Sequence, residues 1–319
     1  MSAPFVSADI GGTNARLAWV RAGDDGRIDV LAQQRYLCAQ HPSLRAILAD
    51  FLDDVAGAPA LALAVAGIVE GDRIISRNLP WPVDTADLRA AGFGEVAAVN
   101  DFVAVAHAWQ CMNEADTLLL TPGVMSPGAG TSLLLGPGTG LGGALRVTRG
   151  GRTLVLPCEP QQVALAPGNL RELAVLGHWM RAGATHVGIG QAVSGPGLEH
   201  LYAALCAIDG AQPRLDSSDA VVAAADGGSD RHAIEAIGMF CGLLGSVVGD
   251  LAMVTAANRV FLAGGVPSKV RNWLLGGTFA QRMVDKDVMR PVLERIPVRL
   301  IEDPALGVIG AASWFLQRG

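Results

Sequence analysis

The sequence contains few cysteines, and they show no paired spacing. The five cysteines lie at positions 38, 111, 158, 206 and 241, and none belongs to a Cys-x-x-Cys pair. An odd number of cysteines without such spacing indicates free thiols in a reducing compartment. No basic segment followed by an apolar run opens the chain, so no secretory signal is predicted. These absences favour a cytoplasmic protein.

Lysine is almost absent, with 2 lysines against 22 arginines. The arginines are spread along the chain and the net charge is −6, which argues against binding to nucleic acid or to an anionic membrane. A P-loop requires Gly-Lys followed by Ser or Thr, and neither Lys269 nor Lys286 follows a glycine. If this protein binds phosphate, backbone amides, threonine hydroxyls and a metal ion must hold it.

Long apolar runs are also scarce. The one run of membrane-spanning length, residues 237–257, contains Asp250 and glycines at 238, 242, 245 and 249. A central aspartate is costly in lipid, so a buried core helix is the better prediction. The six histidines show no metal-ligand spacing and no evident carboxylate partner. With 319 residues, half of them apolar, the chain can form about two domains.

The N-terminal segment predicts a strand, a tight turn and a second strand. Apolar residues lead to Asp9, then come Gly11-Gly12-Thr13-Asn14, and a second apolar run follows. Glycines let the backbone turn sharply, and successive N–H groups in such a turn form an anion-binding concavity. Asp9 lies at the strand end, where a carboxylate can hold hydrated Mg²⁺. Strands are predicted over 5–10, 14–21 and 28–36. A glycine turn without a ligand is the alternative interpretation.

The same pattern restarts in the middle of the chain. Predicted strands over 131–135, 144–147 and 152–156 enclose a glycine-rich turn at 136–143, which indicates a diverged internal duplication. Its Gly138-x-Gly140-x-x-Gly143 spacing matches a dinucleotide fingerprint only formally, because a strand rather than a helix follows. Two β-rich halves facing each other would place the two turns on opposite sides of one cleft.

Other segments complete the predicted α/β organisation. Buried strands are expected over 60–66 and 96–99, and the second one ends at Asn100-Asp101, which is either part of a ligand crevice or a helix N-cap. Trp81 is either a core residue or a platform for a sugar. Polar, Gly and Pro residues concentrate over 110–130. We therefore predict a small domain, 1–110, joined by the C-terminal helix 304–319, and a large domain, 111–303. Helices are expected over 168–181, 195–208, 217–225, 230–256 and 304–316.

Six motifs, taken together and in order, resemble those of the bacterial glucokinases. They are Asp9-Ile-Gly-Gly-Thr-Asn-Ala-Arg16, Asn78-Leu-Pro-Trp81, Asn100-Asp101-Phe, Gly136-x-Gly-Thr-Gly-Leu-Gly142, Ser194-Gly-Pro-Gly197 and Leu262-Ala-Gly-Gly265. These enzymes belong to the hexokinase, heat-shock-70 and actin superfamily. The resemblance covers essentially the whole chain. It implies two ribonuclease-H-like (actin-like ATPase) domains that close a central cleft over ATP and a hexose, and a possible homodimer.

The resemblance also implies a role for each matching residue. Asp101 is expected to be the general base for the sugar 6-hydroxyl, and Asp9 to orient Mg²⁺ through water. The expected sugar ligands are Asn78, Asn100, Asp101, Glu159 and Gln162. The expected nucleotide-binding residues are Asp9, Gly11, Gly12, Thr13 and Asn14 in the first motif, Gly138, Thr139 and Gly140 in the second turn, and Gly264 and Gly265 beside the adenosine.

Two sites depart from the family pattern. Where the family has Glu-Gly-Gly-His, this chain has Glu159-Pro160-Gln161-Gln162, and Gly190 stands where a second sugar-binding glutamate is expected. Gln162 can still donate and accept hydrogen bonds, whereas Gly190 cannot replace a carboxylate. The leading hypothesis is an ATP- and Mg²⁺-dependent kinase that phosphorylates the 6-hydroxyl of glucose or a related sugar. The alternatives are a weakly active sugar- or nucleotide-binding regulator and a kinase for a different sugar.

Overall fold

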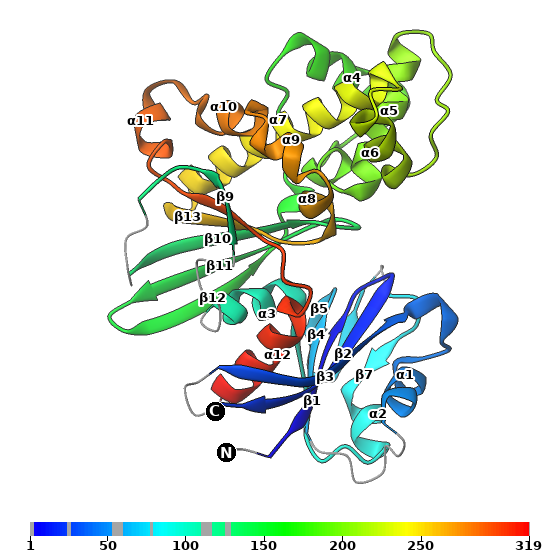
Figure 1. The fold of residues 1–319 in the computed structure, drawn as a ribbon, viewed down its shortest axis with the longest axis vertical. Coiled ribbons are helices and arrows are strands. Elements are labelled where there is room, and N and C mark those ends of the chain that lie inside the picture. Colours follow the sequence, from blue (N-terminus) through cyan, green and yellow to red (C-terminus); the bar gives the residue numbers. More distant parts are fainter. Residues whose placement is uncertain are drawn as a thin grey trace. The chain divides into compact units, whose positions relative to one another are not determined.

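The computed structural model describes residues 3–23, 27–52, 60–76, 79–109, 117–124 and 129–318. The chain divides into two compact units (Figure 1): unit 1 comprises Met1–Asp116 with Asp303–Gly319, and unit 2 comprises Thr117–Glu302. In both units, β-sheets are combined with helices. This is a mixed α/β fold.

Unit 1 contains a five-stranded sheet, a three-stranded sheet and helices. The elements are β1 (Phe5–Ile10), β2 (Asn14–Ala22), β3 (Ile28–Leu37), η1 (Cys38–Gln40), α1 (Leu44–Phe51), β4 (Leu61–Val65), β5 (Ile68–Glu70), β6 (Arg73–Ile75), β7 (Val83–Asp84), α2 (Thr85–Ala90), β8 (Val96–Asn100), α3 (Asp101–Ala108) and α12 (Leu306–Gln317). The large sheet has the order β3-β2-β1-β4-β8, in which β1, β4 and β8 are parallel and β2 and β3 are antiparallel.

Side chains of β1 alternate between the two faces of this sheet, as expected for a strand. Val6, Ala8 and Ile10 are fully buried in a core cluster that includes residues of α1. On the opposite face the side chains meet α12: the ring of Phe5 stacks on Phe315, with centroids 5.2 Å apart. The buried Ser7 hydroxyl donates a 2.6 Å hydrogen bond to the carbonyl of Val308. The last helix of the chain therefore covers the strand with which the chain begins.

Unit 2 contains a six-stranded sheet and most of the helices. The elements are β9 (Thr117–Thr121), β10 (Gly130–Pro137), β11 (Leu141–Arg149), β12 (Arg152–Cys158), η4 (Pro160–Gln162), α4 (Leu170–Arg181), η5 (Ile189–Gln191), α5 (Gly195–Ile208), α6 (Ser218–Asp226), α7 (Arg231–Val254), β13 (Ala257–Leu262), α8 (Gly265–Lys269), α9 (Arg271–Leu275), α10 (Thr278–Val284), η6 (Asp287–Met289), α11 (Arg290–Leu293) and β14 (Val298–Ile301).

The two large sheets share one topology. The order in unit 2 is β12-β11-β10-β13-β14-β9, with β10, β13 and β14 parallel and β11 and β12 antiparallel. This repeats the order and the strand directions of unit 1, and β9 adds an antiparallel edge strand. The predicted restart of strand, glycine turn, strand and strand is confirmed. Because β11 starts at Leu141, within this motif, a strand stands where the fingerprint requires a helix, and the rejection of a dinucleotide fingerprint is also confirmed.

Several elements were not predicted from the sequence. The polar segment 70–82 contributes to a small antiparallel sheet, β5-β6-β7. Strand β9 forms within the region expected to separate the domains, because it pairs with β14 far along the chain. Helices α9 and α10 follow the short α8. These elements depend on pairing or packing between distant segments, which local patterns do not reveal.

The long helix α7 is a core helix of unit 2, as predicted. It is long and apolar enough to cross a membrane, but 72% of its apolar window is buried inside the protein. Its glycines allow α10 to pack closely: a methyl group at Gly245 would lie 2.1 Å from the carbonyl oxygen of Phe279, and one at Gly249 would lie 2.3 Å from that of Met283. A methyl group at Gly238 would meet no atom within 4 Å.

We predict opposite effects for the same substitution at two positions of α7. Gly245→Ala is expected to lower the free energy of unfolding by about 1–3 kcal/mol, because the methyl group forces α7 and α10 apart. Gly238→Ala is expected to raise it by up to about 1 kcal/mol through helix propensity. Urea denaturation of both variants tests this prediction. Equal effects at the two positions would contradict the role assigned to Gly245.

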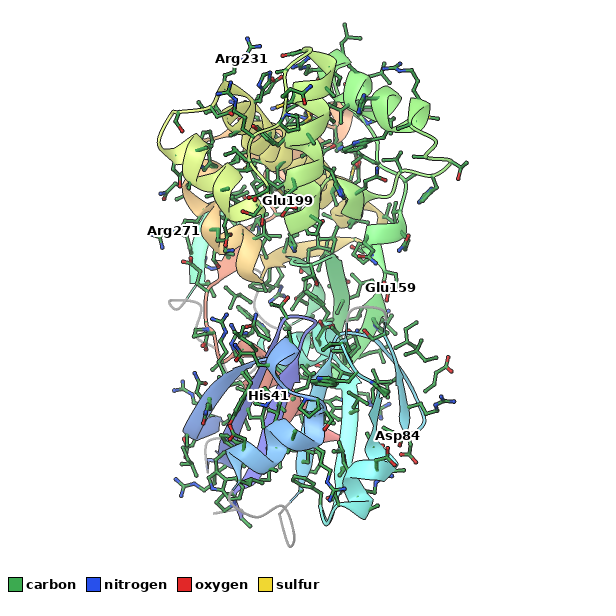
Figure 2. The ribbon with its side chains drawn as sticks, turned by 90° about the vertical axis from the view of Figure 1, so that its right-hand side faces the viewer. His41, Asp84, Glu159, Glu199, Arg231 and Arg271 are labelled. Carbon is green, nitrogen blue, oxygen red and sulfur yellow. The ribbon has the colours of Figure 1, made fainter. Side chains whose placement is uncertain are left out.

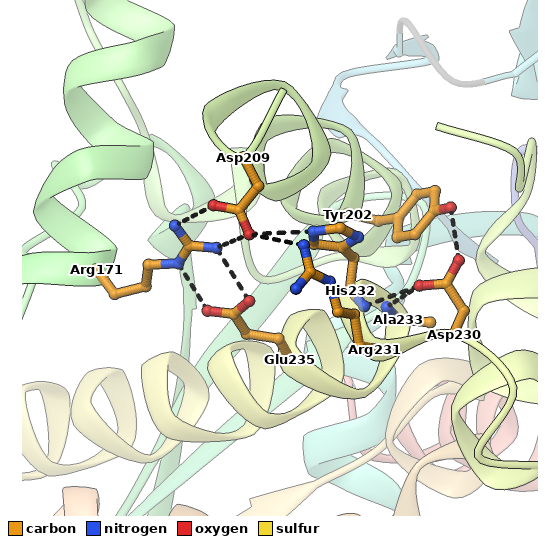
Figure 3. A network of polar contacts seen from close by, with 8 residues as sticks. All are labelled: Arg171, Tyr202, Asp209, Asp230, Arg231, His232, Ala233 and Glu235. Carbon is orange, nitrogen blue, oxygen red and sulfur yellow. Dashed lines mark hydrogen bonds and ion pairs between the residues drawn. The ribbon is translucent and has the colours of Figure 1, made fainter. Parts of the chain in front are cut away.

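A network of charged side chains joins α4, α5 and α7 on unit 2 (Figure 3). Arg171 donates bidentate hydrogen bonds to Asp209, at 2.8 and 3.0 Å, and also binds Glu235 at 2.7 Å. The ring of the buried His232 lies 3.1 Å from Asp209. Hydrogen bonds from Arg171 and His232 lower the pKa of Asp209 to about 2. The expectation that no histidine has a carboxylate partner was therefore wrong for His232, because Asp209 is distant in sequence.

Candidate active site

The carboxyl ends of three parallel strands meet at one edge of the sheet in unit 1. Ile10 of β1 lies beside Val65 of β4, which lies beside Asn100 of β8. The segments that follow these strands are the first glycine turn (residues 11–14), Ala66 with Gly67, and the start of α3. In open α/β sheets this edge is where ligands bind. The sheet thus brings together Asp9, the first glycine turn and Asp101, which were predicted separately.

The first glycine turn is closed by backbone hydrogen bonds. The N–H of Gly11 donates to the carbonyl of Asn14 at 2.9 Å, and the N–H of Cys38 donates to the carbonyl of Thr13 at 3.0 Å. The side-chain oxygen of Asn14 accepts a 2.8 Å hydrogen bond from Arg35 of β3. The side chain of Asn14 therefore anchors the turn to the neighbouring strand, while Gly11, Gly12 and Thr13 present a small, partly exposed surface.

Asp9 precedes this turn and points toward the start of α12. Its side chain is 23% exposed and lies 3.8 Å from the guanidinium of Arg16, its cross-strand partner. A methyl group at Gly307 would lie 2.3 Å from the Asp9 carboxylate, so glycine is required there for close packing. Burial raises the pKa of Asp9, and the charge of Arg16 opposes this rise.

These surroundings fit a magnesium ion held partly by water. Mg²⁺ is usually bound by one or two carboxylates together with water and substrate phosphates, and not by an all-protein cage. Within the described ranges, no three or more His, Cys, Asp or Glu side chains are grouped closely enough to hold a metal ion by themselves. Asp9 is one partly buried carboxylate beside a turn suited to phosphate. When bound, Mg²⁺ would offset the negative charge of the phosphates.

Asn100 and Asp101 form the junction between β8 and α3. The side-chain oxygen of Asn100 accepts hydrogen bonds from the N–H groups of Phe102, at 3.0 Å, and Val103, at 3.3 Å. Its amide nitrogen donates to the carbonyl of Gly67 at 3.2 Å. Asn100 is therefore the N-cap of α3, one of the two predicted alternatives. Asp101 is the first helical residue and is half-buried, and its carboxylate accepts the Phe102 N–H at 2.9 Å.

Two further predictions in unit 1 have different outcomes. Trp81 is 8% exposed and its indole N–H donates to the carbonyl of His41 at 3.1 Å, so it is a core residue. Asn78, predicted as a sugar ligand, lies outside the described residues.

The second glycine turn (residues 138–141) lies at the corresponding edge of the sheet in unit 2. Its backbone closes through a 2.8 Å hydrogen bond from the Gly138 N–H to the Gly140 carbonyl. The Gly138 carbonyl accepts a 2.7 Å hydrogen bond from Gly195, the first residue of α5. Gly264 has a φ of +100°, and a methyl group there would lie 3.0 Å from the Pro137 carbonyl oxygen. Because β10 pairs with β13 and Gly264 lies against Pro137, the turn and the residues that follow β13 lie at the same edge of the sheet. The nucleotide-binding role of Gly138, Thr139, Gly140, Gly264 and Gly265 stays a prediction.

The predicted sugar-binding segment (residues 159–162) follows β12 and lies beside this turn. Glu159 is exposed at the surface of unit 2 (Figure 2), and Gln162 is also exposed. His186 binds the Gln162 carbonyl at 2.9 Å. Pro160 is buried, and its ring would lie 3.1 Å from a methyl group at Gly143. The segment is thus fixed by its backbone and by Pro160, while Glu159 and Gln162 remain accessible.

One contact in this region was not predicted. The side-chain oxygen of Gln161 accepts a hydrogen bond from the N–H of Leu141 at 3.3 Å. Gln161 also occupies the space beside Gly190, because a methyl group at Gly190 would lie 2.8 Å from the Gln161 Cβ. The only sign of this contact in the sequence was that Gln161 and Gly190 both differ from the residues that the family has at these positions.

The chain is similar to known proteins along almost its whole length. A family model for glucokinase matches residues 6–318. The chain belongs to the glucokinase family. The chain is 42% identical to a glucokinase-like protein of Xylella fastidiosa, over 98% of this chain and 95% of the relative. It is 35% identical to a glucokinase of Saccharophagus degradans, over 98% of each chain.

Among solved structures, the chain is similar to a glucokinase from an Antarctic psychrotroph. The TM-score is 0.83 at 28% identity, and the match covers 98% of both chains. This glucokinase-family protein is a hexose kinase. The resemblance predicted from six short motifs is therefore confirmed along nearly the whole chain.

Proposed function

We propose that this protein transfers the γ-phosphate of ATP to the 6-hydroxyl of glucose or a closely related hexose, with Asp101 as the general base. The observation that carries this assignment is the position of Asp101 at the carboxyl end of β8, in the same row of strands as Asp9 and the first glycine turn. The turn proposed to bind phosphate and the residue proposed as the base thus follow strands at one edge of one sheet.

In the proposed reaction, the sugar oxygen forms a bond to the γ-phosphorus while the bond to the ADP oxygen breaks. The hydroxyl proton passes to the Asp101 carboxylate. Catalysis by such a site consists mainly of positioning the reactants and neutralising charge. Asp101 is fixed at the start of α3 by its own hydrogen bond to the Phe102 N–H. The carboxylate form of an aspartate is the form that accepts a proton.

The proposal assigns the nucleotide to backbone groups of both units, each taken as a ribonuclease-H-like (actin-like ATPase) domain. Gly11, Gly12 and Thr13 would border the phosphates, and Asp9 would hold Mg²⁺ through water. The residues assigned in unit 2 are Gly138, Thr139 and Gly140 for phosphate and Gly264 and Gly265 for adenosine. Asn14 and Asn100 would act mainly by holding the turn and the helix start, since both side chains are hydrogen-bonded within the protein. We propose a cytoplasmic enzyme, and the family resemblance suggests a homodimer.

A second candidate is a related protein with altered sugar preference or weak activity that acts as a regulator. The observation that favours it is the packing at Gly190. Gln161 leaves no space for a side chain at that position, so Glu159 and Gln162 are the accessible polar groups assigned to the sugar in unit 2.

A coupled assay of ADP release with ATP, Mg²⁺ and glucose tests the proposal. We expect saturable turnover, with glucose 6-phosphate identified as the product by phosphorus NMR. A panel of hexoses, amino sugars and N-acyl sugars ranks kcat/KM. A panel in which another sugar ranks first supports the altered-preference candidate. Nucleotide binding in calorimetry without turnover of any sugar would contradict the proposed function and favour a regulator.

A further inference from the structure

Gln161 connects two loops that have different proposed ligands. It belongs to the segment 159–162, between the proposed sugar ligands Glu159 and Gln162. Its half-buried side chain reaches the second glycine turn, where its oxygen accepts the Leu141 N–H at 3.3 Å. Leu141 is 1% exposed and is the first residue of β11. The bond therefore joins the proposed sugar segment to the point at which the proposed phosphate turn becomes a strand.

Three glycines lie close to Gln161, and a side chain at any of them would meet an atom of Gln161. A methyl group at Gly140 would lie 2.3 Å from the Gln161 side-chain oxygen. One at Gly188 would lie 2.5 Å from the Gln161 carbonyl oxygen, and one at Gly190 would lie 2.8 Å from the Gln161 Cβ. Atoms of real side chains do not approach so closely. The fit of the segment against the turn therefore depends on residue 161 and on these glycines together.

The segment is also held on its other side. The Ile189 N–H donates to the Val163 carbonyl at 2.8 Å, and Ser194 donates to the Gly190 carbonyl at 2.7 Å. The backbone around Gly190 is thus fixed from both directions. Since the surrounding backbone is held, changing the Gln161 side chain should alter the contact with the turn more than the position of residues 188–190.

We propose that Gln161 is a positioning residue that couples the sugar segment to the phosphate turn, so that substitutions in one loop change the affinity of the other for its ligand. This inference rests on the proposed function. Small displacements of positioned groups have large effects on transfer reactions. A side chain that holds both loops is suited to set the distance between the accepting sugar and the phosphate donor.

The first test is Gln161→Met, which keeps most of the volume and removes the strong acceptor. We expect KM for ATP to rise about three- to tenfold, as for the loss of one hydrogen bond, although Gln161 belongs to the sugar segment. The matched control is Gln33→Met, because Gln33 is exposed on β3 of unit 1, and its kinetic constants should stay within about 1.5-fold of the wild type. An unchanged KM for ATP in Gln161→Met overturns the proposal.

A double-mutant cycle separates coupling from general damage. Gly190→Ala alone is expected to lower kcat/KM for the sugar at least fivefold, because its methyl group meets the Gln161 Cβ. In the Gln161→Gly background the same substitution should change kcat/KM less than twofold, since the remaining contacts at 3.5 Å are ordinary. Additive effects would overturn the coupling. A comparable thermal midpoint in all variants excludes a loss of folded protein.

A third measurement remains valid even if the proposed function fails. Hydrogen exchange of the Leu141 amide and the calorimetric affinity for ATP require no sugar turnover. We expect faster Leu141 exchange and weaker ATP binding in Gln161→Met than in the wild type. If the wild type phosphorylates no hexose but these two differences appear, the proposed function fails and the link between Gln161 and the turn stands. If neither difference appears, the link itself is overturned.

Discussion

Replacing Asp101 with asparagine is expected to lower kcat for hexose phosphorylation by about 10²–10⁴-fold, the usual contribution of a general base. Asparagine keeps the shape and the oxygen that accepts the Phe102 N–H, so α3 should form normally. It cannot accept the proton of the sugar hydroxyl at neutral pH. KM for ATP should change little, because Asp101 is not assigned to the nucleotide. Steady-state kinetics with ATP and glucose measures both constants.

The matched control is Asp84→Asn. Asp84 also stands at the start of a helix, where its carboxylate caps α2 by accepting the Ala86 N–H at 2.8 Å. It lies at the edge strand of the small sheet in unit 1 and has no assigned role in the reaction. We expect its kcat to stay within about twofold of the wild type. A kcat for Asp101→Asn within threefold of the wild type would remove Asp101 as the base, whatever the control shows.

Replacing Arg282 with methionine is expected to lower the free energy of unfolding of unit 2 by about 3–5 kcal/mol, the usual cost of breaking a buried ion pair from one side. Arg282 binds both oxygens of Glu172, at 2.5 and 3.1 Å. The Glu172 side chain is 3% exposed. Among the described residues, the substitution leaves this buried carboxylate with the Gly168 N–H and the Asn169 amide as its hydrogen-bond donors. Urea denaturation gives the change.

Arg290 provides the matched Arg→Met control. It is half exposed and approaches Asp285 at 3.7 Å and Glu294 at 3.9 Å. Exposed pairs of this kind contribute about 0–1 kcal/mol, so Arg290→Met should be nearly neutral. Equal destabilisation by the two substitutions would show that packing of the arginine stem, and not the buried charge, explains the effect. The Glu172→Gln and Arg282→Met double variant should recover part of the stability, because it removes the unpaired charge.

The sequence predicts the parts of the site that local chemistry determines. An apolar run that ends in Asp9 and is followed by glycines is typical of a strand that leads into a tight turn. The observed strands β1 and β2 accordingly have nearly the predicted bounds. Asn100 was left between two roles because both a helix cap and a ligand favour asparagine. The structure shows the cap, through hydrogen bonds from the N–H groups of Phe102 and Val103, and the ligand role of Asn100 stays a prediction. Local sequence could not decide, since the same residue type serves both.

The missed features all require knowledge of distant partners. The hydrogen bond that the Leu141 N–H donates to Gln161 depends on the antiparallel pairing of β11 with β12, in which Gly143 lies opposite Cys158. The partner of His232 is Asp209, which lies 23 residues earlier in the sequence, before helix α6. Strand β9 forms because it pairs with β14 in an antiparallel arrangement. In each case the residue types alone do not indicate a contact, and the contact can be recognised only when the folded structure shows which residues are neighbours.

The packing of α12 on β1 determines the order in which the two units can finish folding during synthesis. The chain leaves the ribosome from its N-terminus, so the residues of β1 emerge long before those of α12. Until α12 is synthesised, the face of the sheet that carries Phe5, Ser7 and Asp9 lacks its cover. Unit 2, whose segments are continuous in sequence, can complete its fold earlier. The carboxylate proposed to hold the metal therefore reaches its final surroundings only after α12 has been synthesised.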